Sequence, residues 1–583
     1  TKEVYLDVIS DRILDTKKFE LTDIKLNEML YQLIDTAGIR KTNNLIEKEG
    51  IKRSKKQFKE ADINLLVLDA TRKLSQDDKD LLESIDNKKT IVIWNKIDLQ
   101  KPQEKLKLKN LKKRTKRLFF KMSISKNAKN VLEQRYCRPG EQPKDVYKRV
   151  ADALSLGDKK FENKLRKSMT EGYFLPNSPC IRNAGKKKGM LHACFVLPIE
   201  DTMDSISKAL HDMILIFKNG GGVGINFSKL RPKDAPLSSG GTSSGVVSFM
   251  KLFDTATEVV KQGGFRRGAL MGVLNFEHAE IIEFIRSKIA GSLTNFNISV
   301  MVSNKFMQDV EKNNKIELKN PTNNETWQTL NAKTIFDVMC FCAWNSGDPG
   351  FLFYDRINQD NILFPKVKIK TTNPCGEVPL PPYGACCLGS INVSKLLRYN
   401  KFDFDLFEKY LEIAVRALRN NNAISHYPLP EITKTMKELD PIGVGIMGFA
   451  DCLIKLGIYY DSQECLDFID QLGLVYKTTT DKLAKTCFWK RIIAPTGTLS
   501  LLANCSSGIE PIFDIDFEKH LTVGIIRETR ELYKSKYVRT AHDISPEWHI
   551  KIQAKWQEWL DGSISKTINM PNDATEEEVF EAY

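Results

Sequence analysis

One pentapeptide brings three reactive side chains together, and it reads Asn373-Pro374-Cys375-Gly376-Glu377. Pro374 restricts the backbone and Gly376 permits a sharp bend, so we predict a tight loop with the Cys375 thiol at its tip. An amide and a carboxylic acid beside one sulfur suit a reaction in which hydrogen leaves a substrate carbon while hydroxyl protons move. If the pentapeptide is considered by itself, a loop that holds an ordinary buried cysteine remains the alternative.

The composition is that of a globular protein. The 583 residues suffice for two to four domains or for one large barrel with an addition. No run approaches the roughly 18 apolar residues of a membrane span, and Thr1-Lys2-Glu3 does not resemble the start of a signal peptide. We therefore expect a cytoplasmic protein with no membrane partner.

The cysteines and histidines indicate redox chemistry rather than a metal site. The chain has 12 Cys and 7 His. In a chain of this kind we expect no disulfide scaffold, so any cysteine pair belongs to a redox cycle. No Cys/His cluster has the spacing of a zinc site, and we predict no structural metal.

Positive charge is concentrated near the start of the chain. Residues 1–126 carry 30 Lys and Arg against 20 Asp and Glu, so most of the net charge of +14 lies there. Much of the excess falls in Lys101–Lys121, which is an RNA-binding patch or a solvated helix face. We favour the solvated face, and the asymmetry predicts two unlike parts.

Hydrophobic spacing in the second part predicts helices that alternate with strands. Two apolar stripes with helical spacing consist of Ile206, Leu210, Met213 and Phe217, and of Phe407, Leu411, Val415 and Leu418. Between them an alternating pattern typical of a half-buried strand consists of Val223, Ile225 and Phe227. Alternation of this kind over several hundred residues predicts a parallel or mixed α/β barrel.

The first part contains two motifs of nucleotide-binding proteins. Strand-like runs at 31–36, 63–69 and 90–94 alternate with helical stretches such as 47–60, which predicts a parallel α/β sheet. The first run ends in Asp35-Thr36-Ala37-Gly38, and the third leads into Asn95-Lys96-Ile97-Asp98. In this arrangement Asp98 could accept hydrogen bonds from guanine while Asn95 and Lys96 brace the loop. Residues 1–125 resemble the G domain of bacterial GTPases that modify the wobble uridine of tRNA.

The phosphate-binding loop of such a domain is absent from the sequence. No Gly-x-x-x-x-Gly-Lys-[Ser/Thr] occurs, so no amide nest holds a β-phosphate and no Ser/Thr ligates Mg²⁺. We expect a partial GTPase-like domain without competent GTP hydrolysis. We also expect its central first strand to be missing, which would put its folding in question.

A series of motifs in the second part occurs in the order of a known family. The series comprises Val131–Tyr136, Pro176–Pro179, Leu191–Phe195, Gly220–Asn226, Gln262–Ala269, Asn373–Glu377, Cys386–Asn392, Pro495–Ser500 and Cys505–Pro511. Residues 127–583 therefore resemble class II, adenosylcobalamin-dependent ribonucleotide reductase. Asn-Pro-Cys-Gly-Glu and Cys-Ser-Ser-Gly-Ile-Glu-Pro are more similar to this cobalamin group than to the iron-dependent group.

This resemblance implies the fold. We expect an α/β protein with a ten-stranded ribonucleotide-reductase-type barrel, a finger loop inside it, and the partial GTPase-like domain before it. The implied domains are 1–125, an N-terminal helical segment at 127–200, and the catalytic barrel at 201–583. Relatives continue beyond the helix that reaches Tyr583, so we expect the last barrel strand and the cysteine-bearing tail to be missing here.

The resemblance also implies catalytic roles. Cys375 becomes a thiyl radical that removes the 3′-hydrogen of a ribose, Glu377 takes the 3′-hydroxyl proton, and Asn373 orients that region. The S–H bond is close in strength to the C–H bond, so the radical can be returned.

The reducing dithiol is assigned in the same way to Cys194 and Cys386, which would form a disulfide in each turnover. Their sulfurs can bond only if the Cα atoms approach within about 7 Å. Cys387 would point to the opposite face of a strand and pack there. We interpret Cys180 and Cys505 as buried small side chains.

Nucleotide-binding residues follow from matching motif positions. The implied substrate contacts are Ser178, Ala193 and Gly222, with a phosphate-binding turn made of Pro495, Thr496, Gly497, Thr498, Leu499 and Ser500. The implied site for a nucleoside triphosphate effector comprises Asp201, Thr202, Met203, Arg231 and Arg266.

The expected cofactor is adenosylcobalamin, with its cobalt, and the expected reductant is a thioredoxin-like protein or a small dithiol. We expect no nucleic-acid partner for the reductase part. The oligomeric state stays open, with a homodimer as one alternative. Two other functions also stay open: a class I large subunit whose radical comes from a partner, and a GTP-binding fragment that acts in tRNA modification.

Overall fold

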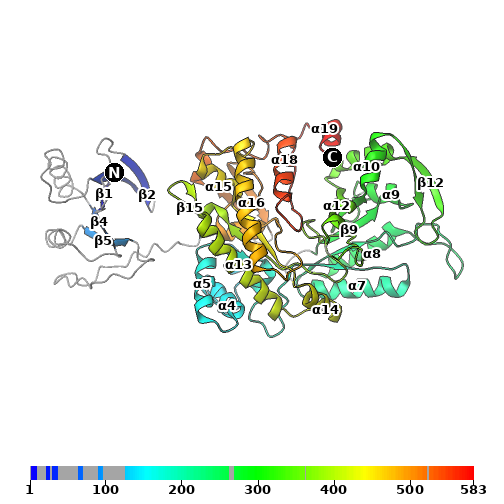
Figure 1. Cartoon of the computed structure of the whole chain (residues 1–583), viewed down its shortest axis with the longest axis horizontal. Coiled ribbons are helices and arrows are strands. Elements are labelled where there is room, and N and C mark those ends of the chain that lie inside the picture. Colours follow the sequence, from blue (N-terminus) through cyan, green and yellow to red (C-terminus); the bar gives the residue numbers. More distant parts are fainter. Residues whose placement is uncertain are drawn as a thin grey trace. The chain divides into compact units, whose positions relative to one another are not determined.

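The computed structural model describes five strands within residues 1–124, as backbone, and residues 125–583 except 261–267, 290, 362 and 522–523. The chain forms two compact units, Thr1–Ser123 and Ile124–Tyr583 (Figure 1).

The first unit contains a five-stranded sheet. Its order is β2-β3-β1-β4-β5, with bounds Leu21–Leu26, Met29–Thr36, Lys2–Val8, Ile63–Asp69 and Thr90–Asn95. β1 pairs in parallel with β3 and β4, β4 pairs in parallel with β5, and β2 is antiparallel to β3. The three predicted strands are confirmed. The expectation that the central strand is missing is wrong, because Lys2–Val8 occupies that position. The predicted helix at 47–60 and the basic segment Lys101–Lys121 lie outside the described residues.

The second unit begins with helices that pack around a short strand. They are α3 (Lys126–Arg135), α4 (Pro143–Ser155), α5 (Lys159–Thr170) and α6 (Ser178–Asn183), with β6 at Phe174–Pro176. Side-chain caps set their first turns, since Asp158 accepts from the amides of Lys160 and Phe161 at the start of α5. Apolar residues of α4 and α5 then fill the core.

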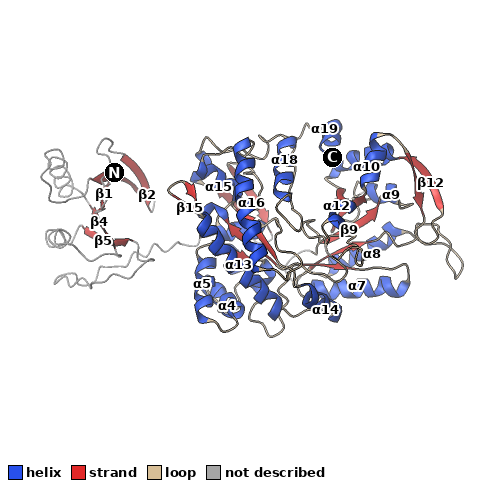
Figure 2. Cartoon of the chain, viewed as in Figure 1, coloured by secondary structure: helices blue, strands red, loops and turns tan. Residues whose placement is uncertain are grey.

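Five parallel strands form the first sheet of this unit. The order is β13-β10-β9-β8-β7, with bounds Gly350–Phe353, Phe296–Val302, Leu270–Asn275, Gly222–Asn226 and Cys194–Leu197. The connecting helices are α7 (Met203–Lys218), α8 (Val246–Val259), α9 (Ile281–Arg286), α10 (Asn304–Glu311) and α11 (Ala332–Ser346). Figure 2 shows helices packed around these strands. The stripe predicted on α7 is confirmed, because Ile206, Met213 and Phe217 are buried.

The prediction of a half-buried strand at 223–227 is wrong in one respect. β8 is buried on both faces, since residues 222–225 are all buried and only Asn226 of this strand is partly exposed. The alternation in sequence is real, but Gly224 lies beneath the loop that carries residue 372. The second face is therefore covered by backbone rather than by water.

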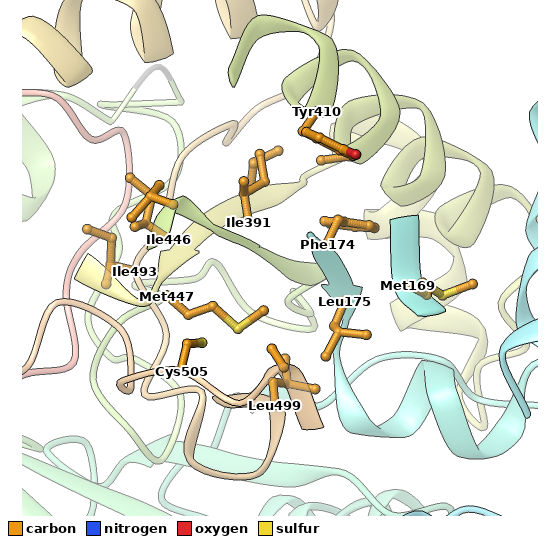
Figure 3. Close-up of a cluster of buried hydrophobic side chains, with 14 of the residues drawn as sticks. Met169, Phe174, Leu175, Ile391, Tyr410, Ile446, Met447, Ile493, Leu499 and Cys505 are labelled. Carbon is orange, nitrogen blue, oxygen red and sulfur yellow. The ribbon is translucent and has the colours of Figure 1, made fainter. Parts of the chain in front are cut away.

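A second sheet has the order β17-β14-β6. β14 (Leu388–Asn392) is parallel to β17 (Gly443–Met447) and antiparallel to β6. Single parallel bridges extend it from Val444 to Arg491 and from Ile493 to Ile564. Figure 3 shows that side chains pack on both faces of this sheet, with Ile391 and Tyr410 on one side and Leu175, Met447, Leu499 and Cys505 on the other.

Two helices in the rest of the unit are long, α13 (Phe404–Ile424) and α16 (Gln463–Leu483), with 21 residues each. The other helices are α14 (Pro430–Leu439), α15 (Phe449–Leu456), α17 (Gly497–Ala503), α18 (Pro546–Gln557) and α19 (Glu576–Ala582). The stripe predicted on α13 is confirmed, since Phe407, Leu411 and Val415 are buried.

Smaller elements complete the unit. They are the hairpin strands β11 (Lys315–Lys319) with β12 (Thr326–Asn331), β15 (Leu397–Arg398) with β16 (Lys401–Phe402), and β18 (Asp516–Leu521) with β19 (Gly524–Thr529), together with α12 (Tyr354–Gln359), η1 (Val393–Lys395) and η2 (Glu531–Lys534).

The two sheets of the second unit meet at one edge. An antiparallel bridge joins Phe195 of β7 to Ala385, and the chain then continues from Ala385 into β14. The α/β class is therefore confirmed. Among the described residues of this unit, the two larger sheets are open and do not form a closed ring, so ten-stranded closure stays a prediction.

Candidate active site

Residues 371–380 form a finger-like loop, called the finger loop below. Thr372 and Pro379 make an antiparallel bridge at its base. At its tip Gly376 has a φ of 83° and its amide donates to the Asn373 carbonyl at 3.1 Å. Cys375 is exposed, whereas Asn373 and Glu377 are buried. The predicted tight loop is confirmed, and the alternative of an ordinary buried cysteine is wrong.

Three contacts fix the finger loop against its surroundings. A Cβ atom on Gly224 of β8 would overlap the Thr372 carbonyl oxygen, so only glycine allows this close approach. The Asn297 amide of β10 donates to the Pro374 carbonyl at 2.7 Å. The backbone amide of Ser563 donates to the Glu377 carbonyl at 2.9 Å. The loop is thus held by the first sheet and by the C-terminal segment together.

Two thiols lie beside the base of the finger loop. The Cys386 amide donates to the Cys194 carbonyl at 3.0 Å, and the Phe195–Ala385 bridge places the two cysteines opposite each other on antiparallel segments. Residues that face each other as a hydrogen-bonded pair on antiparallel strands have Cα atoms about 5.5 Å apart. This distance is within the limit of about 7 Å for the Cα atoms of a disulfide. Both thiols are free in this structure.

The dithiol and the finger loop share one electrostatic environment. A hydrogen bond with Cys386 and then burial raise the pKa of Cys194 well above its ordinary value; the Glu377 carboxyl raises it further, and the Asn373 amide lowers it. The structure therefore brings Cys194, Cys386, Asn373 and Glu377 together, although they come from three distant segments.

Glu377 has a carboxyl group suited to proton transfer near neutral pH. Burial raises the pKa of Glu377 to about 7, and the Asn373 side chain opposes this only in part. Among the described residues, Glu377 Oε2 and Asn373 Nδ2 are buried without a well-aligned hydrogen-bond partner. An unpaired acceptor and an unpaired donor at one site can bind the hydroxyl groups of a ligand.

The other cysteines near these segments pack into the core. Cys387 lies on the opposite face from Cys386, and its thiol donates to the Leu418 carbonyl at 3.4 Å. Cys180 and Cys505 are buried in the same apolar cluster. The interpretation of all three as packing residues is confirmed.

The predicted phosphate-binding turn forms the start of α17. Thr496 has a φ of 53°, and its hydroxyl accepts from the Gly508 amide at 2.7 Å. The Ser500 and Ser507 hydroxyls lie 2.9 Å apart. Gly497 is exposed and Thr498 is partly exposed, whereas Leu499 is buried in the core. The first amides of a helix have no partner within it, so this turn can bind phosphate oxygens.

The predicted substrate residues lie near this turn and near the dithiol. The Gly222 amide donates to the Ala193 carbonyl at 2.8 Å, next to Cys194. Ser178 accepts a hydrogen bond from the Tyr136 hydroxyl at 2.8 Å. The preceding Arg135 donates to the Thr498 hydroxyl at 3.1 Å. The end of α3 therefore contacts both Ser178 and the turn.

Sequence reasoning missed several of these supporting residues. Asn297 and Ser563 belong to no motif, so nothing in the sequence indicated them. Arg135 and Tyr136 stand in the motif Val131–Tyr136, but the sequence did not indicate their contacts with Thr498 and Ser178. His192 did stand within a motif. Its ring is held between Ser425 at 2.9 Å and Asn422 at 2.8 Å, and burial lowers its pKa to about 4, so it is neutral.

The predicted effector residues gather at the start of α7. Asp201 accepts from the Arg231 amide at 3.0 Å and from its guanidinium at 2.6 Å. Thr202 caps α7 by accepting from the Ser205 amide, and Met203 is 65% exposed. Arg266 lies outside the described residues, so only four of the five predicted residues are placed.

In the first unit, Asp35 and Asn95 lie near the carboxyl ends of β3 and β5. Because these strands run in the same direction through β1 and β4, both residues are at the same edge of the sheet. Gly38, Lys96 and Asp98 are outside the described residues.

Within the described ranges, no three His, Cys, Asp or Glu side chains are grouped to hold a metal ion. No helix in that part of the chain is long and apolar enough to cross a bilayer. A cavity of about 700 Å³ between α13 and α14 contains none of the predicted catalytic residues.

Comparison with known families assigns most of the chain. Residues 192–482 and 518–583 match the family described as "Ribonucleotide reductase, barrel domain", and residues 122–189 match "Ribonucleotide reductase, all-alpha domain". Residues 5–96 match "50S ribosome-binding GTPase".

Curated relatives agree with the first two matches. A vitamin B12-dependent ribonucleoside-diphosphate reductase of Thermoplasma acidophilum is 39% identical over 72% of this chain and 63% of its own length. One of Mycobacterium tuberculosis is 34% identical over 79% of this chain and 77% of its own length. A ribonucleoside-diphosphate reductase subunit alpha of Chlamydia pneumoniae is 25% identical over 62% of this chain and 39% of its own length. The chain thus spans less than two thirds of the first of these relatives.

Proposed function

The chain belongs to the ribonucleotide reductase family, and we propose that it reduces ribonucleotides to 2′-deoxyribonucleotides for DNA synthesis by a thiyl-radical mechanism. One observation carries this proposal. An exposed cysteine at the tip of the finger loop lies two residues from a buried amide and two residues from a carboxyl group with a pKa of about 7, and both of these groups adjoin a pair of opposed thiols.

The first step uses the finger loop. The Cys375 sulfur radical takes the 3′-hydrogen atom, so that an S–H bond forms and the ribose C3′–H bond breaks. Glu377 accepts the proton of the 3′-hydroxyl, and the Asn373 amide donates to a ribose oxygen. The unpaired Glu377 Oε2 and Asn373 Nδ2 support these two roles.

The second step uses the dithiol. The 2′-hydroxyl leaves as water, and Cys194 and Cys386 supply two electrons and two hydrogens while their sulfurs bond. One ribonucleotide and two thiols thus give one deoxyribonucleotide, one disulfide and one water. The hydrogen atom on Cys375 then returns to C3′, which restores the radical, and Glu377 returns its proton to the 3′-oxygen. An external dithiol then reduces the disulfide.

The cofactor proposed for the radical is adenosylcobalamin. Bound adenosylcobalamin supplies the one-electron oxidant that removes hydrogen from the Cys375 thiol. The exposure of Cys375, between the buried Pro374 and the partly exposed Gly376, fits a group that approaches from outside the loop. A sulfur buried like that of Cys386 would not fit.

The substrate proposed is a ribonucleoside diphosphate. Its phosphates bind at the turn 495–500, and its ribose lies near Ser178, Ala193 and Gly222. An effector nucleotide is proposed at Asp201 and Arg231. For residues 1–123 we propose a G-domain-type sheet.

A cofactor-omission assay tests this function. We expect deoxycytidine diphosphate from cytidine diphosphate when the full chain is supplied with adenosylcobalamin and a small dithiol, and none when adenosylcobalamin is omitted. Equal product without it would favour the class I alternative. No product in either case would contradict reductase activity of this chain.

A further inference from the structure

A buried ion pair lies behind the loop that follows the phosphate-binding turn. Asp451 of α15 and Arg530, which follows β19, are joined by a contact of 2.8 Å between Asp451 Oδ2 and Arg530 Nη1. Their side chains are 3% and 13% exposed. A pair this buried is costly to desolvate, so its position in the fold needs a structural reason.

Both partners of this pair bind the backbone of loop 505–508. Asp451 Oδ2 also accepts from the Ser506 amide at 3.1 Å. The other arm of the Arg530 guanidinium donates to the Cys505 carbonyl at 2.9 Å. The Gly448 amide at the start of α15 donates to the Ser506 carbonyl at 2.8 Å. The ion pair and α15 therefore fix this short loop.

The same loop fixes the phosphate-binding turn. The Gly508 amide donates to the Thr496 hydroxyl at 2.7 Å, and Ser507 meets Ser500 at 2.9 Å. Thr496 has a left-handed backbone, which is rare for a β-branched residue and needs support from its surroundings. Figure 3 shows Leu499 of the turn and Cys505 of the loop on the same side of the sheet.

We propose that Asp451 and Arg530 are positioning residues for the turn that binds the substrate's phosphates. They act through loop 505–508 on Thr496, and Thr496 sets the direction of the first amides of α17. This inference rests on the proposed function, and it assigns recognition of the diphosphate, rather than of the ribose or base, to residues outside the turn itself.

A binding comparison with the full chain tests the inference. Calorimetric titration measures Kd for cytidine diphosphate and for cytidine with the wild type and with Asp451→Asn. Loss of one charge-assisted contact predicts a rise of about tenfold in the Kd for cytidine diphosphate. The Kd for cytidine should change by less than about twofold, because no phosphate is involved.

A control is available on the same hairpin. Asp516→Asn breaks an exposed pair with Arg527, whose Nε lies 2.8 Å from Asp516 Oδ1, and it should leave both Kd values unchanged. Equal weakening of both ligands by Asp451→Asn, or no weakening, would overturn the inference. If Asp451→Asn does not fold, Arg530→Lys replaces it, since a lysine keeps the charge but cannot make both contacts. The same comparison then applies: the Kd for cytidine diphosphate should rise and the Kd for cytidine should not. Failure of the proposed function would show separately, as normal binding without deoxynucleotide.

Discussion

The site residues differ in solvent exposure, and the difference matches their proposed roles. Cys375 is exposed, which suits contact with a radical source, whereas Cys386 and Glu377 are buried beside the partly buried Cys194. Burial shifts the pKa of Glu377 into the physiological range. A hydrogen bond with Cys386, together with burial, raises the pKa of Cys194 and keeps it as a thiol. A protonated thiol can deliver hydrogen as well as electrons, as the proposed second step requires.

The pKa of Glu377 predicts the pH dependence of activity. Only the ionised carboxyl accepts a proton, so kcat/KM for the wild type should fall about tenfold per pH unit below pH 7. Glu377→Gln should lower activity about 10²- to 10⁴-fold and should remove the fall of kcat/KM below pH 7. A pH–rate profile of both proteins measures the effect. The same fall below pH 7 in the variant would contradict the role of Glu377 as the proton acceptor.

The same shift also predicts a stability effect. Because the folded-state pKa is raised from 4.5 to about 7, the fold favours the protonated form. The contribution of Glu377 to the free energy of unfolding is therefore greatest below pH 4.5, and it decreases by roughly 3 kcal/mol as the pH rises through about 7. Urea unfolding at pH 5 and pH 8 should show a smaller decrease for Glu377→Gln.

Two adjacent cysteines give a matched pair of variants. Cys386→Ser should abolish deoxynucleotide formation, and Cys387→Ser should keep most of it, because Cys387 packs on the opposite face. Thiol titration after turnover without external reductant should show two thiols lost per wild-type chain. The same loss in Cys386→Ser would rule out the proposed dithiol.

How far the sequence predicts these residues depends on whether they lie in a local motif. Asn373, Cys375 and Glu377 are adjacent, so their shared loop could be predicted. The approach of Cys194 to Cys386 joins segments almost two hundred residues apart, and only the family resemblance indicated it. Ser563 could not have been predicted, because it contributes a long-range contact from a segment without a motif. Arg135 stands in the motif Val131–Tyr136, but that motif does not show that Arg135 contacts Thr498, which lies far away in the sequence.

At the scale of elements, the finger loop depends on the strand beneath it. Sequence alternation correctly predicted strand β8 but not the burial of its second face, because a strand pattern carries no information about which backbone will cover it. Strand β8 and the finger loop meet at Gly224. A glycine is needed at this position because the Thr372 carbonyl leaves no room for a Cβ atom, and not because of strand propensity.

A substitution at Gly224 tests whether the position of the finger loop depends on strand β8. Gly224→Ala should push the finger loop outward, destabilise the chain by about 1–3 kcal/mol, and lower activity more than tenfold. Gly350→Ala in β13 is the control, since its nearest new contact is the Ser299 hydroxyl at 3.3 Å. Thermal unfolding and product assays measure both. Full activity in Gly224→Ala would show that the loop tolerates displacement.

At the scale of the whole molecule, the two compact units contain different sheets and match different families. The division could be predicted from charge and motifs. The central strand Lys2–Val8 could not, because it carries no nucleotide-binding motif and precedes the first recognisable run.

The independence of the second unit gives a further prediction. Residues 124–583 expressed alone should fold and should match the full chain in deoxynucleotide formation within about twofold, because their core and all proposed site residues lie within that unit. Circular dichroism and the product assay check this. Loss of activity on removal of residues 1–123 would assign a role in reduction to the first unit.

The central claim is that one sulfur, that of Cys375, carries the radical. The most direct measurement compares deoxycytidine diphosphate formation by the wild type and by Cys375→Ser, each with adenosylcobalamin and a small dithiol. We predict product from the wild type and none from Cys375→Ser, with both proteins equally folded. Equal product from the two proteins would contradict the proposed mechanism.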